Sequence, residues 1–235
     1  MTSGHIHSFQ SLGAADGPGI RFVVFMQGCN LRCGYCHNPD TWECGIGKEC
    51  SPGETADKVE RYKSYFGKDG GITVSGGEPL LQAQFVRELF IICKSKGINT
   101  CLDTSGSVIN DEVLSLLDVC DRVLLDIKFT DDDNYRKYIG CSFEKPLEFL
   151  EILQQKNIPT WLRQVIVPTL NDNEENIKRL SDIAKSHSCV EKVELLPFRK
   201  ICKSKYDNMG IEFPFEKYDV PSKETMNKLN EILLF

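Results

Sequence analysis

The sequence predicts an α/β protein built around a parallel sheet. Short apolar runs alternate along the chain with longer amphipathic stretches of helical periodicity. The apolar runs are nearly continuous, which is typical of strands buried on both faces. Because the connections are short, residues 1–235 are expected to form one domain. An open partial barrel and a doubly wound sheet both fit this order, and in both architectures ligands bind at the carboxyl ends of the strands.

Six strands are expected. The first, RFVVFMQ, is rich in Val and Phe, and the fourth, RVLLDIK, is strongly apolar. A loop rich in Cys, Gly and Asn follows the first strand and extends to about residue 52. The expected strands are residues 21–27, 71–75, 99–103, 122–128, 160–167 and 192–196.

Helices are expected between these strands and after the last one. Ser51 and Thr55 are candidate caps for the first helix, and Gly97 ends the second. The acidic runs at residues 131–133 and 171–175 are interpreted as turns and helix starts rather than metal sites. The expected helices are residues 55–66, 81–96, 111–118, 146–156, 173–186 and 222–234.

The composition is that of a globular protein outside the membrane. Of the 235 residues, 41% are hydrophobic and 26% are charged, and the net charge is −6. No apolar run approaches the roughly 20 residues of a membrane span. The acidic balance argues against nucleic-acid binding, for which a basic domain is typical. The first residues lack the basic flank and apolar stretch of a secretion signal, so a cytoplasmic location is expected.

Cysteine is unusually frequent. The chain has 11 cysteines, an odd number, and without an export signal a disulfide framework is not expected. Most are scattered singly and are interpreted as small buried hydrophobic residues. Cys44 and Cys50 are expected to be thiols without a ligand role on a mobile loop.

Three cysteines are clustered directly after the first expected strand. Cys29, Cys33 and Cys36 have the spacing C-x3-C-x2-C. Three thiolates this close can hold three corners of a 4Fe–4S cluster, which leaves one iron open for catalysis. The alternative from spacing alone is a structural zinc site with Cys44 or Cys50 as the fourth ligand.

This pattern resembles the signature of radical S-adenosylmethionine (SAM) enzymes, including the aromatic Tyr35 before the third cysteine. The surrounding segments are similar to the activating enzymes of glycyl radical enzymes, most closely the pyruvate formate-lyase type. The resemblance extends over nearly the whole chain and includes GHIHSF at 4–9, DGPGIR at 16–21, YCHNPDTW at 35–42, VSGGEP at 74–79, LDTSG at 102–106, LDIK at 125–128, WLR at 161–163 and ELLP at 194–197.

The resemblance implies a fold and an activity. The fold is a partial (β/α)6 barrel of parallel strands forming one radical SAM core domain, residues 1–235, with the cluster-binding loop at about residues 28–42. The implied activity is anaerobic activation of pyruvate formate-lyase: reductive cleavage of SAM at the 4Fe–4S cluster yields methionine and a 5′-deoxyadenosyl radical, which abstracts a glycine hydrogen.

Two other functions stay open. The first is activation of a different glycyl radical enzyme, or action on a small molecule. Many such activases carry a ferredoxin-like insert with further cysteine clusters, whereas here only Cys44 and Cys50 lie between Cys36 and Gly76. The second is a non-catalytic iron–sulfur or zinc module, which would give the GGE and D-x-K segments no role.

The resemblance also implies site residues. Cys29, Cys33 and Cys36 hold the cluster, and Lys128 is assigned to catalysis with them. Two glycines allow close backbone approach to a ligand, and an ammonium aimed at a carboxylate makes a charge-assisted contact. The SAM-binding residues implied are Tyr35, Cys36, His37, Asn38, Gly76, Gly77, Glu78, Asp103, Asp126, Ile127, Lys128 and Arg199.

Simpler interpretations remain for several of these residues. Gly76 and Gly77 could form a plain strand exit, and His37 could be structural. Asp126 and Lys128, two apart at the end of the fourth expected strand, could form a salt bridge at the rim of the barrel. Arg199 stands where the family often has a histidine, and a guanidinium donates hydrogen bonds but accepts none.

The remaining implied ligands are a cation and two proteins. Oxygen ligands suit a hard monovalent cation beside SAM, and the implied ligands are Asp103, Thr104, the Leu124 carbonyl and Asp126. Asp16 and Arg163 match positions that seat the glycine loop of pyruvate formate-lyase, although without the resemblance they would be ordinary surface charges. The family implies flavodoxin or ferredoxin as electron donor and a monomeric enzyme.

Overall fold

A computed structural model describes residues 2–235 and contains one eight-stranded sheet. The six expected parallel strands are all present and lie side by side in chain order. Their carboxyl ends therefore meet at one edge of the sheet. These strands are β2 (Arg21–Met26), β4 (Gly71–Gly76), β5 (Asn99–Thr104), β6 (Arg122–Asp126), β7 (Thr160–Ile166) and β8 (Val190–Pro197).

Two strands that we did not expect extend the sheet beyond β2. β1 (Gly4–Gly13) pairs antiparallel with β2, and the short β3 (Lys48–Cys50) pairs antiparallel with the start of β1. Both carry many polar residues, so neither has the apolar run of a buried strand. The expectation for Cys50 is wrong, because it is buried at the end of β3 rather than lying on a mobile loop.

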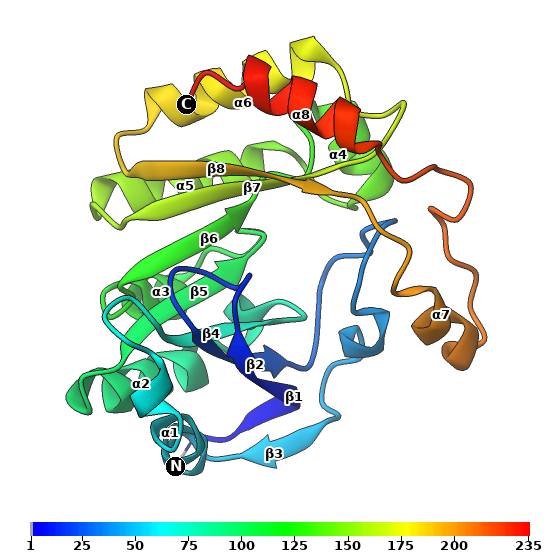
Figure 1. Cartoon of the computed structure of the whole chain (residues 1–235). Coiled ribbons are helices and arrows are strands. Elements are labelled where there is room, and N and C mark those ends of the chain that lie inside the picture. Colours follow the sequence, from blue (N-terminus) through cyan, green and yellow to red (C-terminus); the bar gives the residue numbers. More distant parts are fainter. Residues whose placement is uncertain (1) are drawn as a thin grey trace.

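The sheet curves but does not close, since β3 and β8 form its two edges. Apart from α7, which Figure 1 shows at the right away from the strands, the helices lie on the outer side of this curved sheet, so the fold is a partial barrel and not a doubly wound sheet. The helices are α1 (Pro52–Glu60), α2 (Ala83–Ser95), α3 (Asp111–Leu117), α4 (Asp132–Tyr138), α5 (Glu144–Gln155), α6 (Glu174–Ser186), α7 (Lys203–Met209) and α8 (Lys223–Ile232). Three 3-10 turns are η1 (Pro39–Thr41), η2 (Lys63–Tyr65) and η3 (Pro79–Gln82).

Local capping chemistry sets several helix ends. Ser51 and Glu54 form a reciprocal capping box, so α1 starts at Pro52, three residues before the expected start, and ends at Glu60. The acidic run at 131–133 starts a helix as expected, because the Asp131 side chain accepts from the Asn134 N–H. Although that run was interpreted as a turn or a helix start, the expected helices included neither α4 nor α7, which have seven residues each and few apolar positions. Among residues 2–235, no helix is long and apolar enough to cross a membrane.

The buried apolar side chains form two separate clusters. The larger one lies between the sheet and helices such as α2, α3 and α5. The smaller one, which we call the aromatic core, lies beside the carboxyl ends of the strands. Its buried members are Leu31, Tyr35, Phe129, Tyr135, Ile139, Val167, Phe198, Cys202, Tyr206, Phe213 and Phe215.

Arg21, at the start of β2, is fully buried and makes no ion pair within residues 2–235. Its guanidinium donates instead to neutral oxygens of Thr73, Asn99, Pro18, Asp69 and Ile72. Burial lowers the pKa of this guanidinium. These contacts tie the segment at 16–20 to the starts of β4 and β5.

We expect Arg21→Met to lower the free energy of unfolding by about 3 kcal/mol, because several buried acceptors lose their donor at once. Urea denaturation under anaerobic conditions measures this change. Arg61→Met is the matched control, since Arg61 is exposed on the turn after α1, and it should change stability by no more than about 0.5 kcal/mol. Equal stability of the two variants would contradict the structural role of Arg21.

Candidate functional site

The loop that carries the three cysteines is held from outside by α4 and the aromatic core. The Arg32 and Gly34 N–H groups donate to the carbonyls of Ile139 and Tyr138, at 3.3 and 2.8 Å. A side chain on Gly34 would collide with the Phe215 ring, since its Cβ would lie 2.2 Å from a ring carbon. Glycine is therefore required for this close packing.

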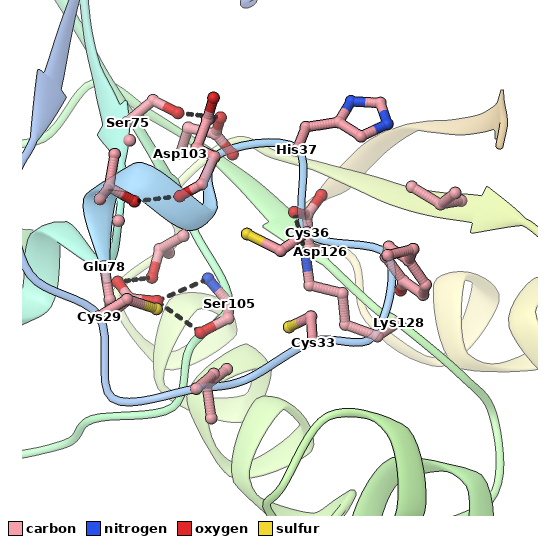
Figure 2. Close-up of a pocket in the computed structure, with 18 of the residues that line it drawn as sticks. Cys29, Cys33, Cys36, His37, Ser75, Glu78, Asp103, Ser105, Asp126 and Lys128 are labelled. Carbon is pink, nitrogen blue, oxygen red and sulfur yellow. Dashed lines mark hydrogen bonds and ion pairs between the residues drawn. The ribbon is translucent and has the colours of Figure 1, made fainter. Parts of the chain in front are cut away.

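The three cysteines face one cavity. Figure 2 shows the sulfur atoms of Cys29, Cys33 and Cys36 turned toward a common space, and all three residues line the same pocket. Burial raises the pKa of the Cys29 and Cys33 thiols to about 12 and also raises the pKa of Cys36. Since thiolates are the metal ligands, assembly of a cluster here must displace these protons.

The arrangement fits a three-cysteine cluster better than a four-cysteine zinc site. Cys44 is exposed and Cys50 is buried in β3, and neither lines the cavity. No three His, Cys, Asp or Glu side chains among residues 2–235 are grouped closely enough to hold a single metal ion. The Tyr35 hydroxyl, buried between the cavity and the aromatic core, has no hydrogen-bond partner within the described residues.

The two glycines after β4 are required by the backbone around them. A Cβ on Gly77 would lie 2.1 Å from the Gly28 carbonyl oxygen, and Gly76 has a φ of 109°. The Glu78 N–H donates to the Gly28 carbonyl at 2.8 Å. The turn therefore lies against Gly28, the first residue of the cysteine loop, and Gly76 and Gly77 line the cavity together with Cys29.

Glu78 is buried and fixes this turn. Its carboxylate accepts from the Leu80 N–H at 3.2 Å and the Ser105 N–H at 3.0 Å, and from the hydroxyls of Thr104 and Ser105. Burial raises the pKa of the Glu78 carboxyl, although these hydrogen bonds act in the opposite direction. One carboxylate thus joins the segments that follow β4 and β5.

Two carboxylates and two cations lie together at the ends of β5, β6 and β7. Lys128 Nζ is 2.6 Å from Asp126 Oδ2, Arg163 Nε is 3.2 Å from Asp126 Oδ1, and the Arg163 guanidinium also pairs with Asp103. Ser75 donates to Asp103 at 2.7 Å. We call Asp103, Asp126, Lys128 and Arg163 the charged quartet. Figure 2 labels its members Asp103, Asp126 and Lys128 beside the cysteines.

Ion pairs within the charged quartet offset the free-energy cost of burying its charges. Burial opposes the charge on Lys128, yet Asp126 raises the Lys128 pKa well above its usual value. Burial also opposes the charge on Asp126, but Lys128 and Arg163 hold its pKa below the usual range. The same balance raises the pKa of Arg163. These ion pairs therefore keep Asp126, Lys128 and Arg163 in their charged forms near neutral pH.

The structure refines the expected position of Lys128. β6 ends at Asp126, so Lys128 lies beyond the strand and not within it. The expected salt bridge between the two is present, and both residues also line the cavity. The two interpretations of this pair are thus compatible.

Most of the expected site residues line this cavity, but four do not. The Arg199 side chain is exposed, and it is the Arg199 carbonyl that lies 3.1 Å from His37 Nε2. Asp16 lies behind the quartet, where burial and the nearby Asp103 raise its pKa. Leu124 and Ile127 are buried within and just after β6. The expected residues that line the cavity are Cys29, Cys33, Tyr35, Cys36, His37, Asn38, Gly76, Gly77, Glu78, Asp103, Thr104, Asp126, Lys128 and Arg163.

Sequence reasoning missed part of the cavity wall. Ser75 and Ser105 are adjacent to expected residues, and Val165 and Leu196 lie near the carboxyl ends of β7 and β8. Strand position could have found the last two, because they lie at the same end of the sheet as Asp126. Together with Leu31, they contribute aliphatic side chains to the cavity wall.

Comparisons with known proteins agree with this geometry. The model of the radical SAM superfamily matches residues 23–180. The pyruvate formate-lyase 1-activating enzyme of Escherichia coli K12 is 44% identical over 233 residues, which cover 98% of this chain and 95% of that protein. The chain belongs to the pyruvate formate-lyase-activating enzyme family of the radical SAM superfamily. Membership implies a 4Fe–4S cluster and SAM as cofactors.

Other members of this family and solved structures show the same relationship. The Clostridium pasteurianum pyruvate formate-lyase-activating enzyme is 44% identical over 99% of this chain and 98% of its own. A domain of such an enzyme from Bacteroides vulgatus superposes with a TM-score of 0.58 at 25% identity, covering 70% of this chain and 92% of that one. Streptococcus suis SuiB, bound to its precursor peptide SuiA, shares the fold alone, with a TM-score of 0.70 at 15% identity over 89% of this chain and 44% of its own.

We expect Glu78→Gln to destabilise this activating-enzyme fold by about 1–3 kcal/mol. Each carboxylate oxygen accepts a backbone N–H, from Leu80 or Ser105, so the amide nitrogen must face one of these donors in either orientation. Anaerobic urea denaturation measures the loss. Glu43→Gln makes the same chemical change at an exposed position and should have almost no effect. A neutral Glu78→Gln would contradict the proposed fixing of the turn.

Proposed function

We propose that this chain activates pyruvate formate-lyase under anaerobic conditions by placing a radical on a glycine of that enzyme. The observation that carries the proposal is that three cysteines of one loop and the ends of β4, β5 and β6 line one cavity. Near full-length similarity to activating enzymes of this name supports the choice of substrate. Cys29, Cys33 and Cys36 would hold a 4Fe–4S cluster with one iron open for SAM, and the cluster would supply the electron that cleaves SAM to methionine and a 5′-deoxyadenosyl radical, which would abstract the glycine hydrogen.

The residues of the cavity have complementary roles in this proposal. Cys29, Cys33 and Cys36 ligate the cluster through their thiolates. Lys128 binds the SAM carboxylate. This carboxylate takes the place of Asp126 as the partner of the Lys128 ammonium group. Asp126 is then free to accept from the ribose hydroxyls.

The turn after β4 and the apolar wall complete the SAM site. The backbone at Gly76 and Gly77 binds the SAM amino group, while Glu78 keeps the turn in place. Val165 and Leu196 offer an apolar surface to the adenine ring. These groups orient SAM and exclude water from the reacting atoms.

The glycine loop of the protein substrate must reach the same cavity. Asp16 and Arg163 are proposed to seat it. Because Arg163 pairs with both Asp103 and Asp126, binding of the loop must exchange at least one of these ion pairs for a contact to the peptide. Such an exchange would couple entry of the substrate to rearrangement of the charged quartet.

The proposed setting is the cytoplasm, with flavodoxin or ferredoxin as the electron donor and a monomeric enzyme.

Activation is tested anaerobically with reconstituted, reduced protein, SAM and pyruvate formate-lyase. Electron paramagnetic resonance should show a glycyl radical doublet on the partner, with 5′-deoxyadenosine formed in the same sample. Cys33→Ala should abolish both signals, because it removes a cluster ligand. Cys44→Ala, which alters an exposed thiol outside the cavity, should retain both.

Other outcomes would point elsewhere. Nucleoside without a doublet would indicate another glycyl radical enzyme or a small molecule as the substrate. Neither signal, from protein with a full cluster, would leave only a non-catalytic iron–sulfur module.

A monovalent cation beside SAM is proposed at Asp103, Thr104, the Leu124 carbonyl and Asp126. The Arg163 guanidinium already bridges the two carboxylates, so a cation must share them with Arg163 or displace it. Oxygen donors of this kind suit a hard cation.

If the cation contributes, calorimetry should show tighter SAM binding in potassium chloride than in choline chloride at equal ionic strength. Asp103→Asn removes one charged ligand, so it should lower the ratio of the SAM affinity in potassium chloride to that in choline chloride about tenfold. Asp133→Asn, on the exposed surface of α4, should leave the difference intact. Equal SAM affinity of the unaltered protein in both salts would exclude the cation.

A further inference from the structure

The outer side of the cysteine loop carries a basic and aromatic surface that the reaction in the cavity does not use. Lys137 Nζ lies 4.8 Å from the centre of the Tyr138 ring, and Lys217 Nζ lies 5.3 Å from that of Tyr218. The two tyrosine hydroxyls are 3.2 Å apart. Two segments that are far apart in the sequence thus each place a lysine ammonium group over the ring of the following tyrosine. We call Lys137, Tyr138, Lys217 and Tyr218 the outer face.

The cations of the outer face have no carboxylate partners. Lys137 and Lys217 are exposed, and neither makes an ion pair within residues 2–235. The adjacent Glu216 is already paired with Lys203 at 2.9 Å. In a chain with a net charge of −6, an unpaired basic cluster is a local exception.

This surface is joined to the cysteine loop by direct contact. Gly34, next to Cys33, donates its N–H to the Tyr138 carbonyl at 2.8 Å and packs against the Phe215 ring. The centre of the Phe215 ring lies 5.3 Å from that of Tyr138 and 4.7 Å from that of Tyr218. Figure 1 shows the segment between α7 and α8 passing outside the cysteine loop. A short packed path therefore leads from the surface to a cluster ligand.

We propose that the outer face is the docking surface for an acidic one-electron carrier that reduces the cluster. The inference rests on the proposed function, since only a redox cluster needs such a partner. The glycine that loses a hydrogen atom must enter the cavity. An electron can instead come from a donor that binds outside the cysteine loop, close to a cysteine that ligates the cluster. Exposed lysines complement an acidic surface and steer its approach.

The electron count of the step is simple. A reduced flavodoxin in the hydroquinone state loses one electron and becomes the semiquinone. The 4Fe–4S cluster held by Cys29, Cys33 and Cys36 gains that electron and passes to the state that cleaves SAM.

The test measures cluster reduction by reduced flavodoxin in stopped-flow absorbance, using the reconstituted holoenzyme at low and high salt. We expect K137E/K217E to slow reduction at least about tenfold at low salt and to lose most of the salt dependence, because docking charges are screened by salt. The matched control is K185E/K228E on α6 and α8, which makes the same charge change at exposed lysines without ion partners. Flavodoxin should reduce the cluster of this control variant at the same rate as that of the unaltered protein.

Reduction by a small molecule distinguishes an effect on carrier docking from an effect on the reaction in the cavity. With dithionite in place of flavodoxin, K137E/K217E should form 5′-deoxyadenosine and the glycyl radical as the unaltered protein does, with the same iron content. Loss of the dithionite-driven reaction would overturn the proposal, because the lysines would then serve the fold or pyruvate formate-lyase binding. Equal slowing in both double variants would also overturn it. Cluster reduction by flavodoxin without any glycyl radical would instead contradict only the proposed substrate.

Discussion

The structure depends on one geometric constraint, which is that the carboxyl ends of six parallel strands meet at a single edge of the sheet. Side chains from β5, β6 and β7 converge there to form the charged quartet, although Asp103 and Arg163 are 60 positions apart in the chain. Bringing these charges out of water is costly, and the ion pairs offset that cost only because the strand register aligns them. Asp126 and Arg163 are direct neighbours in the pairing of β6 with β7.

The cysteine loop has no regular secondary structure over most of its length, so its shape must come from its neighbours. The aromatic core supplies the outer wall through Phe215, and the turn at Gly76 and Gly77 supplies the inner wall. Each wall approaches so closely that it requires a glycine, Gly34 on one side and Gly77 on the other. These two walls hold the three cysteines in a fixed arrangement around one cavity.

The cavity is internally compensated, and this has a consequence for ligand binding. Lys128 and Arg163 already pair with carboxylates, so in the proposed binding mode a SAM carboxylate or a peptide gains a partner only when an existing pair opens. Such binding would be an exchange of ion pairs, whose net free energy is smaller than that of a new salt bridge. The outer face differs in this respect, because its lysines pair with no carboxylate within residues 2–235.

The sequence by itself determined the α/β class and the six parallel strands, because apolar runs are local patterns. Its motifs also predicted most of the residues that line the cavity. It did not reveal β1, β3, α4 or α7, whose polar or short segments are stabilised by tertiary contacts. Only the tertiary structure placed Arg163 between two carboxylates and turned the Arg199 side chain away from the cavity. It also brought Lys137 and Lys217, 80 positions apart, to one surface beside the cysteine loop, because long-range packing decides which distant side chains meet.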